Sequence, residues 1–319
     1  MRRRVGRRAA MSALVGACAG PGPRRAARVL REGEDATGNV LRWLGTLELD
    51  DAAVGGGLSG LHVADDLTLH AVADLGRWVR GRLVLAADGA PLALEDVSGG
   101  PLCDLAGAAL PRRMLGDAES IAALPGGGWL VGFERVHRIW HYPTLDGPAE
   151  PTETPPGLQW APYNSSVEAM TVLSDGRWLV ITEGLVPPGG TMHDRAGWIG
   201  GPGRWEPLSY RTVGWHDPSD ACALPNGDAL VLERRFTWSE GFTSVVSHLP
   251  APIRAGRTEG IVVARLAPPL PTDNWEGISA FRHGGRQLVA VLSDDNEMPL
   301  QRTLLSVFVW PDFGALATG

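Results

Sequence analysis

The stretch Glu168-Ala-Met-Thr-Val-Leu-Ser-Asp-Gly-Arg-Trp-Leu-Val-Ile-Thr-Glu183 places an acidic residue at each end of two apolar runs that are separated by a tight turn. Three other stretches repeat this arrangement, and they run from Glu119 to Glu134, from Asp220 to Glu233 and from Glu276 to Asp294. A fifth stretch, Gly57 to Asp74, keeps only the closing acid. The opening acids at 119, 168, 220 and 276 are 49, 52 and 56 residues apart, about the length of four strands and their turns. The repeat therefore predicts the blades of a β-propeller.

The rest of the chain from Val40 onward also has the pattern of short strands, which predicts an all-β protein. We expect a β-propeller of five or six four-stranded blades, with further strands over 40–49, 67–73, 82–87 and 303–310. One short helix is expected within 102–114. The first and last strands should share one sheet, because this closes the ring and removes exposed strand edges. A pair of β-sandwich domains is the alternative, but it leaves the repeated acids unexplained.

The turns predict how the acids are arranged. Gly126-Gly127, Asp175-Gly176 and Asn226-Gly227 accept positive φ, so we expect two-residue hairpins. Such hairpins would bring together Glu119 and Glu134, Glu168 and Glu183, and Asp220 and Glu233. The last pair lies one step nearer its turn than the others, so either a bulge corrects the register or Ser219 and Arg234 take these places. Opposed carboxylates repel each other unless a cation, an arginine or a shared proton compensates.

Composition narrows the functional classes. The chain has 319 residues, and its 42 glycines and 25 prolines suit a fold with many short turns. The formal net charge is −7 and all 29 basic residues are arginine, so the electrostatic footprint of nucleic-acid binding is missing. The lack of lysine also excludes a Walker-type phosphate loop and Schiff-base chemistry.

The first 20 residues have the layout of an export signal, with a basic stretch, a short apolar stretch and small residues. The run Val15-Gly-Ala-Cys18 is similar to a bacterial lipoprotein processing site. We therefore expect an exported protein that is periplasmic, secreted or anchored through a lipid on Cys18; the alternatives are a disordered basic tail or a start at Met11. Residues 21–39 are expected to form a linker, 40–313 the propeller domain and 314–319 a tail.

Two further features concern membranes and thiols. No other stretch approaches the roughly 18 uninterrupted apolar residues that a membrane-spanning helix needs. Cys103 and Cys222 could form a disulfide in an oxidising compartment or remain two small buried thiols.

Two segments carry a resemblance to a known family. Glu276-Gly-Ile-Ser, followed by Leu288-Val-Ala-Val-Leu-Ser-Asp-Asp-Asn296 and by the stretch from Pro299 to Phe308, resembles the closing signature of the phytase-like β-propellers with esterase-like activity. Asp220 to Phe236 is similar to another segment of that family. The resemblance spans roughly residues 45–310, and it implies a propeller fold and hydrolysis of phosphate or carboxylic esters, in a family of exported bacterial proteins.

In a propeller, the opening acids would converge at one mouth of the central channel, and the closing acids would lie farther out at the same mouth. The candidate catalytic residues are therefore Glu119, Glu168, Asp220 and Glu276. Hard oxygen ligands suit Ca²⁺, and Mg²⁺ less well. The candidate metal ligands are Glu134, Glu183, Glu233, Asp294, Asp295 and Asn296. A small anionic or ester substrate would be held by Arg234, Arg235, Arg302 and His216, with His216 and His283 as proton carriers.

Other interpretations remain open at this point. The acids could instead accept backbone N–H bonds and pair with arginines in a non-catalytic binding or scaffold propeller, and a calcium-dependent lactonase-like enzyme is a further alternative. A serine nucleophile is disfavoured because no G-x-S-x-G elbow occurs. Trp129 and Trp178 hold equivalent hairpin positions, which predicts packing between blades. Four other tryptophans could line a pocket: Trp160, Trp215, Trp238 and Trp275.

Overall fold

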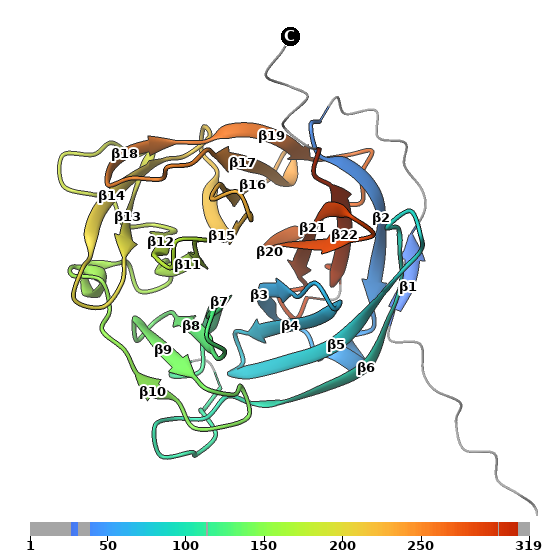
Figure 1. The fold of residues 1–319 in the computed structure, drawn as a ribbon, viewed down its shortest axis with the longest axis horizontal. Helices are drawn as coiled ribbons and strands as arrows, with labels where there is room; N and C mark the ends of the chain where they lie inside the picture. Colours follow the sequence, from blue (N-terminus) through green and yellow to red (C-terminus); the bar gives the residue numbers. More distant parts are fainter. Residues whose placement is uncertain (1–26, 31–38, 113, 299, 312–319) are drawn as a thin grey trace, which may run out of the picture.

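The computed structural model describes residues 27–30, 39–112, 114–298 and 300–311, and it shows five blades arranged in a ring as a propeller (Figure 1). The innermost strands of all five blades line a central channel. Blade 1 contains β3 (Leu58–Val63), β4 (Thr68–Ala73), β5 (Arg77–Leu85) and β6 (Pro91–Pro101). Blade 2 contains β7 (Ala118–Ala123), β8 (Trp129–Phe133), β9 (Arg138–Tyr142) and β10 (Glu150–Pro151). The expected propeller is thereby confirmed, and the described residues form no sixth blade.

The other three blades differ in their outer strands. Blade 3 contains β11 (Val167–Val172), β12 (Trp178–Thr182), β13 (Asp194–Gly200), β14 (Glu206–Arg211) and β18 (Gly256–Glu259). Blade 4 contains β15 (Asp217–Ala223), β16 (Ala229–Thr237), β17 (Gly241–Leu249) and β19 (Ile261–Leu266). Since β18 pairs with β14 before the chain returns as β19, this segment ties blade 4 to blade 3.

Blade 5 closes the ring, as the sequence predicts. It combines β20 (Asn274–His283), β21 (Arg286–Asp294) and β22 (Leu304–Val309) with β2 (Arg42–Leu49) from the start of the domain. A further strand, β1 (Ala27–Leu30), pairs with β2. This strand lies inside residues 21–39, which were expected to form a linker. The described part of 102–114 contains no helix; the only described helices are α1 (Asp51–Val54) and the 3-10 turn η1 (Leu158–Trp160). Neither has the length and apolarity that crossing a bilayer requires.

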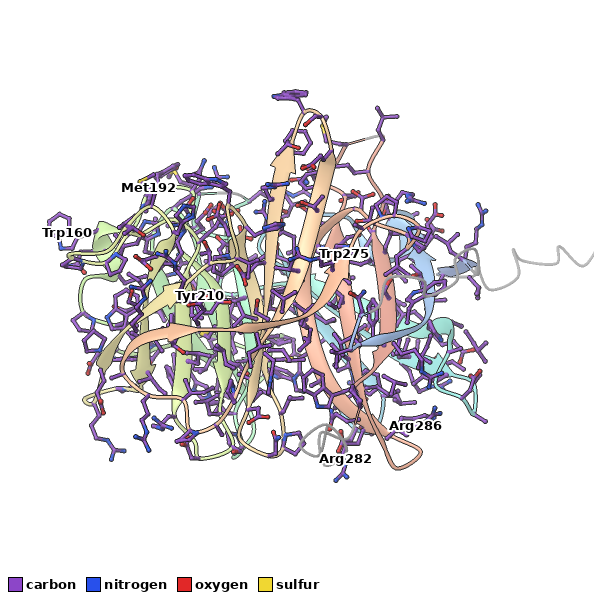
Figure 2. The ribbon with its side chains drawn as sticks, turned by 90° about the horizontal axis from the view of Figure 1, so that it is seen from above. Trp160, Met192, Tyr210, Trp275, Arg282 and Arg286 are labelled. Carbon is purple, nitrogen blue, oxygen red and sulfur yellow. The ribbon has the colours of Figure 1, made fainter. Side chains whose placement is uncertain are left out.

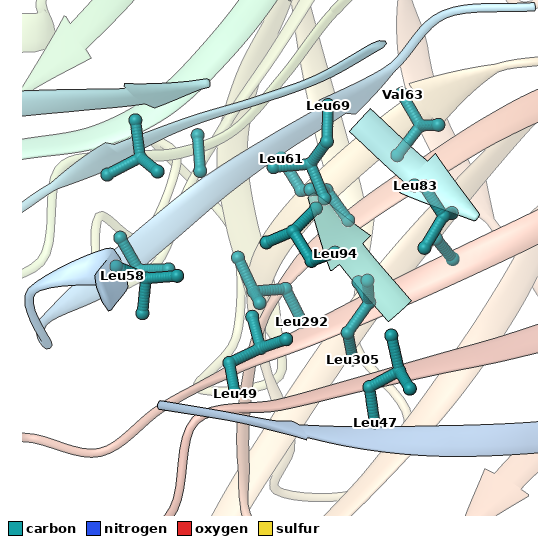
Figure 3. Packing of buried hydrophobic residues seen from close by; sticks show 14 of the residues in the cluster. Leu47, Leu49, Leu58, Leu61, Val63, Leu69, Leu83, Leu94, Leu292 and Leu305 are labelled. Carbon is teal, nitrogen blue, oxygen red and sulfur yellow. The ribbon is translucent and has the colours of Figure 1, made fainter. Parts of the chain in front are cut away.

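Apolar side chains fill the spaces between neighbouring blades. At the closure, Leu47, Leu292 and Leu305 of blade 5 pack with Leu61 and Leu94 of blade 1 in one buried cluster (Figure 3). Trp129 of blade 2 contacts the ring of His70 in blade 1, with 4.4 Å between the ring centroids. These contacts confirm that Trp129 packs between blades. Cys103 and Cys222 are both free thiols.

The hairpins have three-residue loops, so the predicted two-residue turns are wrong. The Leu124 N–H donates to Gly128 O and the Gly127 N–H donates to Leu124 O, and equivalent bonds close the loops at Gly176 and Gly227. Only the last loop residue needs positive φ, at 92° for Gly127, as in a type I turn followed by a left-handed glycine. One more loop residue shifts the register on both strands and changes which residues face each other.

A bulge near the start of each innermost strand also changes the strand register from the one expected. In blade 2 the register shifts between Ala118 and Ser120, so Glu119 has no directly opposed partner. The same shift occurs at Glu168, Ser219 and Glu276. The alternative that Ser219 and Arg234 take the places expected of Asp220 and Glu233 is therefore confirmed.

Candidate functional site

Equivalent residues of the five blades surround one end of the channel. Each blade contributes three such residues, which we call the mouth positions. The first is the bulge residue of the innermost strand, and the second lies two positions before it. The third lies on the second strand or just after it and faces the second residue. The bulge residues are Ser59, Glu119, Glu168, Ser219 and Glu276. The opposed pairs are Gly57 with Asp74, Asp117 with Glu134, Ser166 with Glu183, Asp217 with Arg234, and Asn274 with Asp294.

Nine of these fifteen residues are acidic and one, Arg234, is basic. The mouth positions lie at the end of the propeller where the loops before β11 and β13 carry Trp160 and Met192, whereas Arg282 and Arg286 lie at the opposite end (Figure 2). The repeat thus concentrates negative charge at one mouth of the channel.

Five of the acids form a compact group around Glu134. Its carboxylate belongs to two sets of three, and within each set the oxygens lie within 4.8 Å of one another. One set adds Asp117 and Glu119 of the same blade, and the other adds Glu168 and Glu183 of blade 3. We call these five residues the carboxylate cluster. Two of its members, Asp117 and Glu168, are at most 4% exposed, so their charges are poorly screened by water.

Two arginines compensate part of this charge. Arg135 forms an ion pair with Asp117 at the edge of the cluster. Arg234 reaches from blade 4 to both neighbouring blades, with 3.1 Å from Nη2 to Glu183 Oε1 and 2.9 Å from Nε to Glu276 Oε2. At the mouth as a whole, Arg195 also pairs with Asp217, so three arginines in the described contacts face nine acidic residues, and the acids remain in excess.

Two buried oxygens at the mouth, of Ser166 and Asn274, have no hydrogen-bond partner among the described residues. The hydroxyl of Ser166 is fully buried and unpartnered. Since the Glu183 N–H donates to Ser166 O, the two residues are opposed and their side chains share a face. Asn274 is 2% exposed, and its Oδ1 is unpartnered while its Nδ2 donates to Glu276 Oε1 at 2.7 Å. Buried polar groups normally find a partner, so these oxygens point to a bound group.

Burial and mutual repulsion raise the pKa values of the cluster. The pKa of Glu134 rises from 4.5 to about 7, first through burial and then through Asp117 and Glu183. Burial and the neighbouring acids raise the pKa of Glu119 and of Glu168 well above 4.5. Without a cation, Glu134 therefore holds a proton in roughly half of the molecules near neutral pH.

This arrangement predicts a pH dependence of stability. Between pH 4.5 and about 7, folded Glu134 holds a proton that the unfolded chain has released, so its contribution to stability falls as the pH rises. Buried His62 and His70, with pKa values lowered to about 4, act in the opposite sense. The prediction therefore concerns the difference in free energy of unfolding between wild type and Glu134→Gln. In EDTA, the free energy of unfolding of wild type should fall by about 1–3 kcal/mol relative to that of Glu134→Gln between pH 5 and 7.5. Urea unfolding at each pH measures it, and a constant difference would contradict it.

The structure does not bring Asp220 or Glu233 to the mouth. Asp220 is fully buried, and its carboxylate accepts the N–H groups of Ala221 and Ile278, both at 2.8 Å. Glu233 is also fully buried, where it accepts hydrogen bonds from Tyr210 of blade 3 and from Ser247 of blade 4. Both carboxylates join strands, because they lie one residue nearer their turn than the acids of blades 2 and 3, so Ser219 and Arg234 hold the equivalent places.

The run Asp294-Asp295-Asn296 forms a capped turn. Asp294 Oδ1 accepts the Asn296 N–H at 2.9 Å. Asp295 Oδ1 accepts the Gly57 N–H at 2.8 Å, which joins blade 5 to the start of blade 1. Only Asp294 of this run is a mouth position, and burial raises its pKa to about 8.

Of the residues expected to bind substrate, only Arg234 lies at the mouth. Arg235 pairs with Glu240 in the hairpin between β16 and β17, and the Arg302 side chain lies 3.8 Å from Asp273. His216 Nδ1 bonds Val213 O at 2.8 Å, and burial lowers its pKa. His283 is at the far end of β20 from Glu276.

The other candidates have structural surroundings. The Ser120 hydroxyl donates to Val167 O and the Ser219 hydroxyl to Trp275 O, each in the next blade. Trp275 is 1% exposed and belongs to the core. The three remaining pocket candidates are more than half exposed: Trp160, Trp215 and Trp238.

The sequence reasoning missed Asp117, Ser166 and Asn274. Each lies two residues before a bulge acid, so the signal was present as a third periodic position. It was overlooked because the residue type changes from blade to blade.

The fold and the mouth together define a five-bladed propeller with an acidic channel entrance. The chain belongs to the phytase-like family, whose description is esterase-like activity of phytase and which matches residues 54–297. The family expected from the sequence is thus confirmed, and hydrolase-type chemistry is the activity associated with it.

Several solved structures resemble the chain overall. A gluconolactonase from Xanthomonas campestris is 11% identical, covering 90% of this chain and 99% of that one, with a TM-score of 0.46. The PQQ-bound aldose sugar dehydrogenase from Streptomyces coelicolor is 12% identical, with coverages of 83% and 98% and a TM-score of 0.46. A luciferin-regenerating enzyme is 9% identical, with coverages of 82% and 94% and a TM-score of 0.46. No curated relative matches the chain.

Proposed function

We propose that the protein is a hydrolase of phosphate or carboxylic esters in which the carboxylate cluster holds a divalent cation, with Ca²⁺ favoured over Mg²⁺. The observation that carries this proposal is the position of Glu134 in two sets of carboxylates whose oxygens lie within 4.8 Å. The unpartnered Ser166 hydroxyl beside Glu183 supplies a neutral oxygen to the same place. Ca²⁺ accepts many oxygen ligands of mixed type in irregular geometry, whereas Mg²⁺ demands a near-ideal octahedron.

The residues of the cluster divide into three tasks. Glu134, Glu168 and Glu183 would hold the cation, and Asp117 is already neutralised by Arg135. When bound, the cation would act as a Lewis acid toward a phosphoryl or carbonyl oxygen. We assign proton exchange with a substrate or water to Glu119, which lies beside Glu134 and whose pKa is raised by burial and by the neighbouring acids. Arg234 fixes Glu183 in place from the next blade.

A hydrolysis screen tests this function. Protein stripped with EGTA should be inactive on p-nitrophenyl phosphate and p-nitrophenyl acetate, and CaCl₂ should restore turnover of at least one of them more than MgCl₂ does. Glu119→Gln should lower kcat about 100-fold or more, the usual contribution of a general acid or base, while the calcium Kd changes little. No calcium binding and no turnover would favour the scaffold alternative. Binding without turnover on either ester would favour the lactonase-like alternative, tested next with lactones.

We also propose that the mature protein acts outside the cytoplasm. The export signal and Cys18 lie outside the described residues, so this proposal rests on the sequence pattern alone. Cell fractionation together with the mass of the mature chain tests it. A chain that begins with lipid-modified Cys18 supports the lipoprotein form, and an uncleaved cytoplasmic chain contradicts export.

A further inference from the structure

One blade breaks the charge pattern of the mouth. The residues opposed to the start of the innermost strand are acidic in four blades and basic in one: Asp74, Glu134, Glu183 and Asp294 against Arg234. The backbone bonds place all five equivalently, so Arg234 stands where the repeat otherwise puts a carboxylate. Its guanidinium lies between acids of the two neighbouring blades.

The contacts of Arg234 are those of a bound cation. Its Nε and Nη2 lie 2.9 Å and 3.1 Å from the carboxylates of Glu276 and Glu183, which come from β20 and from the end of β12. Only 26% of its side chain is exposed. The next residue, Arg235, points to the other face of the strand and pairs with Glu240 in the hairpin between β16 and β17.

More oxygen acceptors surround Arg234 than its guanidinium contacts. Asn274 Oδ1 is unpartnered in a residue that is 2% exposed, and Asn274 Nδ2 holds Glu276 Oε1, the oxygen that Arg234 does not take. Asp294 is opposed to Asn274 on the neighbouring strand. Glu183, Glu276, Asp294 and the Asn274 amide would thus offer a second oxygen-rich site if the guanidinium were absent.

We infer that Arg234 is a built-in cation that occupies a second metal position, so that the mouth binds one divalent cation fewer than its carboxylates could hold. This inference rests on the proposed function, since it takes the carboxylate cluster to be a cation site. The arginine keeps Glu183 shared between the cluster and the guanidinium, whereas a second ion between Glu183 and Glu276 would compete with the first for Glu183. The single basic mouth residue therefore determines how many ions bind.

Calorimetric titration of the full chain with CaCl₂, after EGTA treatment, tests the inference through stoichiometry. Arg234→Glu restores an acid at the fifth blade and should bind one more Ca²⁺ per chain than wild type, with a Kd below about 1 mM. Arg234→Gln should also gain an ion, with weaker affinity, and Arg234→Lys should not. Arg235→Ala, which removes the same charge from the adjacent residue on the opposite face, should bind the wild-type number.

The outcomes separate the inference from the proposed function. Wild type that binds calcium, with both Arg234→Glu and Arg234→Gln binding the same number, overturns the inference and leaves the metal-assisted hydrolase intact. If no variant binds calcium, both fail. If Arg234→Glu folds only when calcium is present, circular dichroism during the titration records the additional ion as calcium-dependent folding, and Arg234→Gln then gives the count.

Discussion

Glu134→Gln should abolish ester hydrolysis and weaken calcium binding by about 100-fold or more. Glu134 is the one residue shared by both sets of carboxylates, so its removal takes an oxygen ligand from each. A loss of 100-fold corresponds to about 2.7 kcal/mol, which is in the range of one charged hydrogen-bonding interaction with an ion. Glutamine keeps the shape of the side chain, so the loss would come from charge.

The same substitution should stabilise the protein in the absence of calcium. Burial and the neighbouring acids raise the pKa of Glu134 to about 7, so the ionised side chain opposes folding at pH 7.5. Replacing it removes that repulsion, and urea unfolding in EDTA should show a higher free energy of unfolding than wild type. Loss of function with a gain in stability is expected of a residue held in place for binding.

Glu150→Gln is the matched control. Glu150 lies on β10 of the same blade, is exposed, and pairs with His141 at the outer rim. The Glu150→Gln substitution removes one negative charge at a site outside the channel. Calcium affinity and turnover should therefore stay within about two-fold of wild type, as expected for a screened surface charge. Equal losses in Glu134→Gln and Glu150→Gln would mean that net charge, rather than the cluster, binds calcium.

The fold could be predicted from the sequence because its signals are periodic. Each unit pairs two apolar runs with one turn, and a spacing near 50 residues matches only a few architectures. Ring closure was also predictable, because an unpaired strand remained at each end of the domain. β1 was missed because its four residues, Ala27–Leu30, are too few for a periodic pattern.

The candidate site could be predicted only in part. Glu119, Glu168 and Glu276 fall at bulges, and their repetition placed them correctly at the mouth. Asp220 was grouped with them because sequence alone does not reveal which residue of a strand is bulged. One residue of difference moved it to the opposite face, where it accepts backbone N–H bonds.

Arg234 also shows that the sequence does not reveal the partners of a side chain. The sequence indicated that an arginine could compensate the paired acids, and it named Arg234, Arg235 and Arg302 equally. Only the strand pleat separates the first two, since adjacent residues point to opposite faces. Only the packing of loops shows that Arg302 lies beside Asp273. Chemistry was therefore predictable to the level of residue type and region, and the partners of each side chain were not.

Glu233→Ala should cause a large loss of stability while leaving the calcium site intact. Glu233 is fully buried, and its carboxylate accepts three hydrogen bonds: from Tyr210 at 2.7 Å, Ser247 at 2.6 Å and the Val213 N–H at 2.7 Å. Alanine leaves these three donors unsatisfied around a cavity, which costs about 3–5 kcal/mol. For a domain of this size the melting temperature should fall by roughly 10 °C.

The contrast with Glu134→Gln distinguishes a structural acid from a binding acid. Below its melting temperature, Glu233→Ala should bind calcium within about two-fold of the wild-type Kd, because no member of the carboxylate cluster touches Glu233 in the described contacts. Glu233→Gln keeps one oxygen for two of the donors, so its loss of stability should be smaller. If folded Glu233→Ala instead loses calcium affinity as Glu134→Gln does, Glu233 is a metal ligand, as the sequence pattern first suggested.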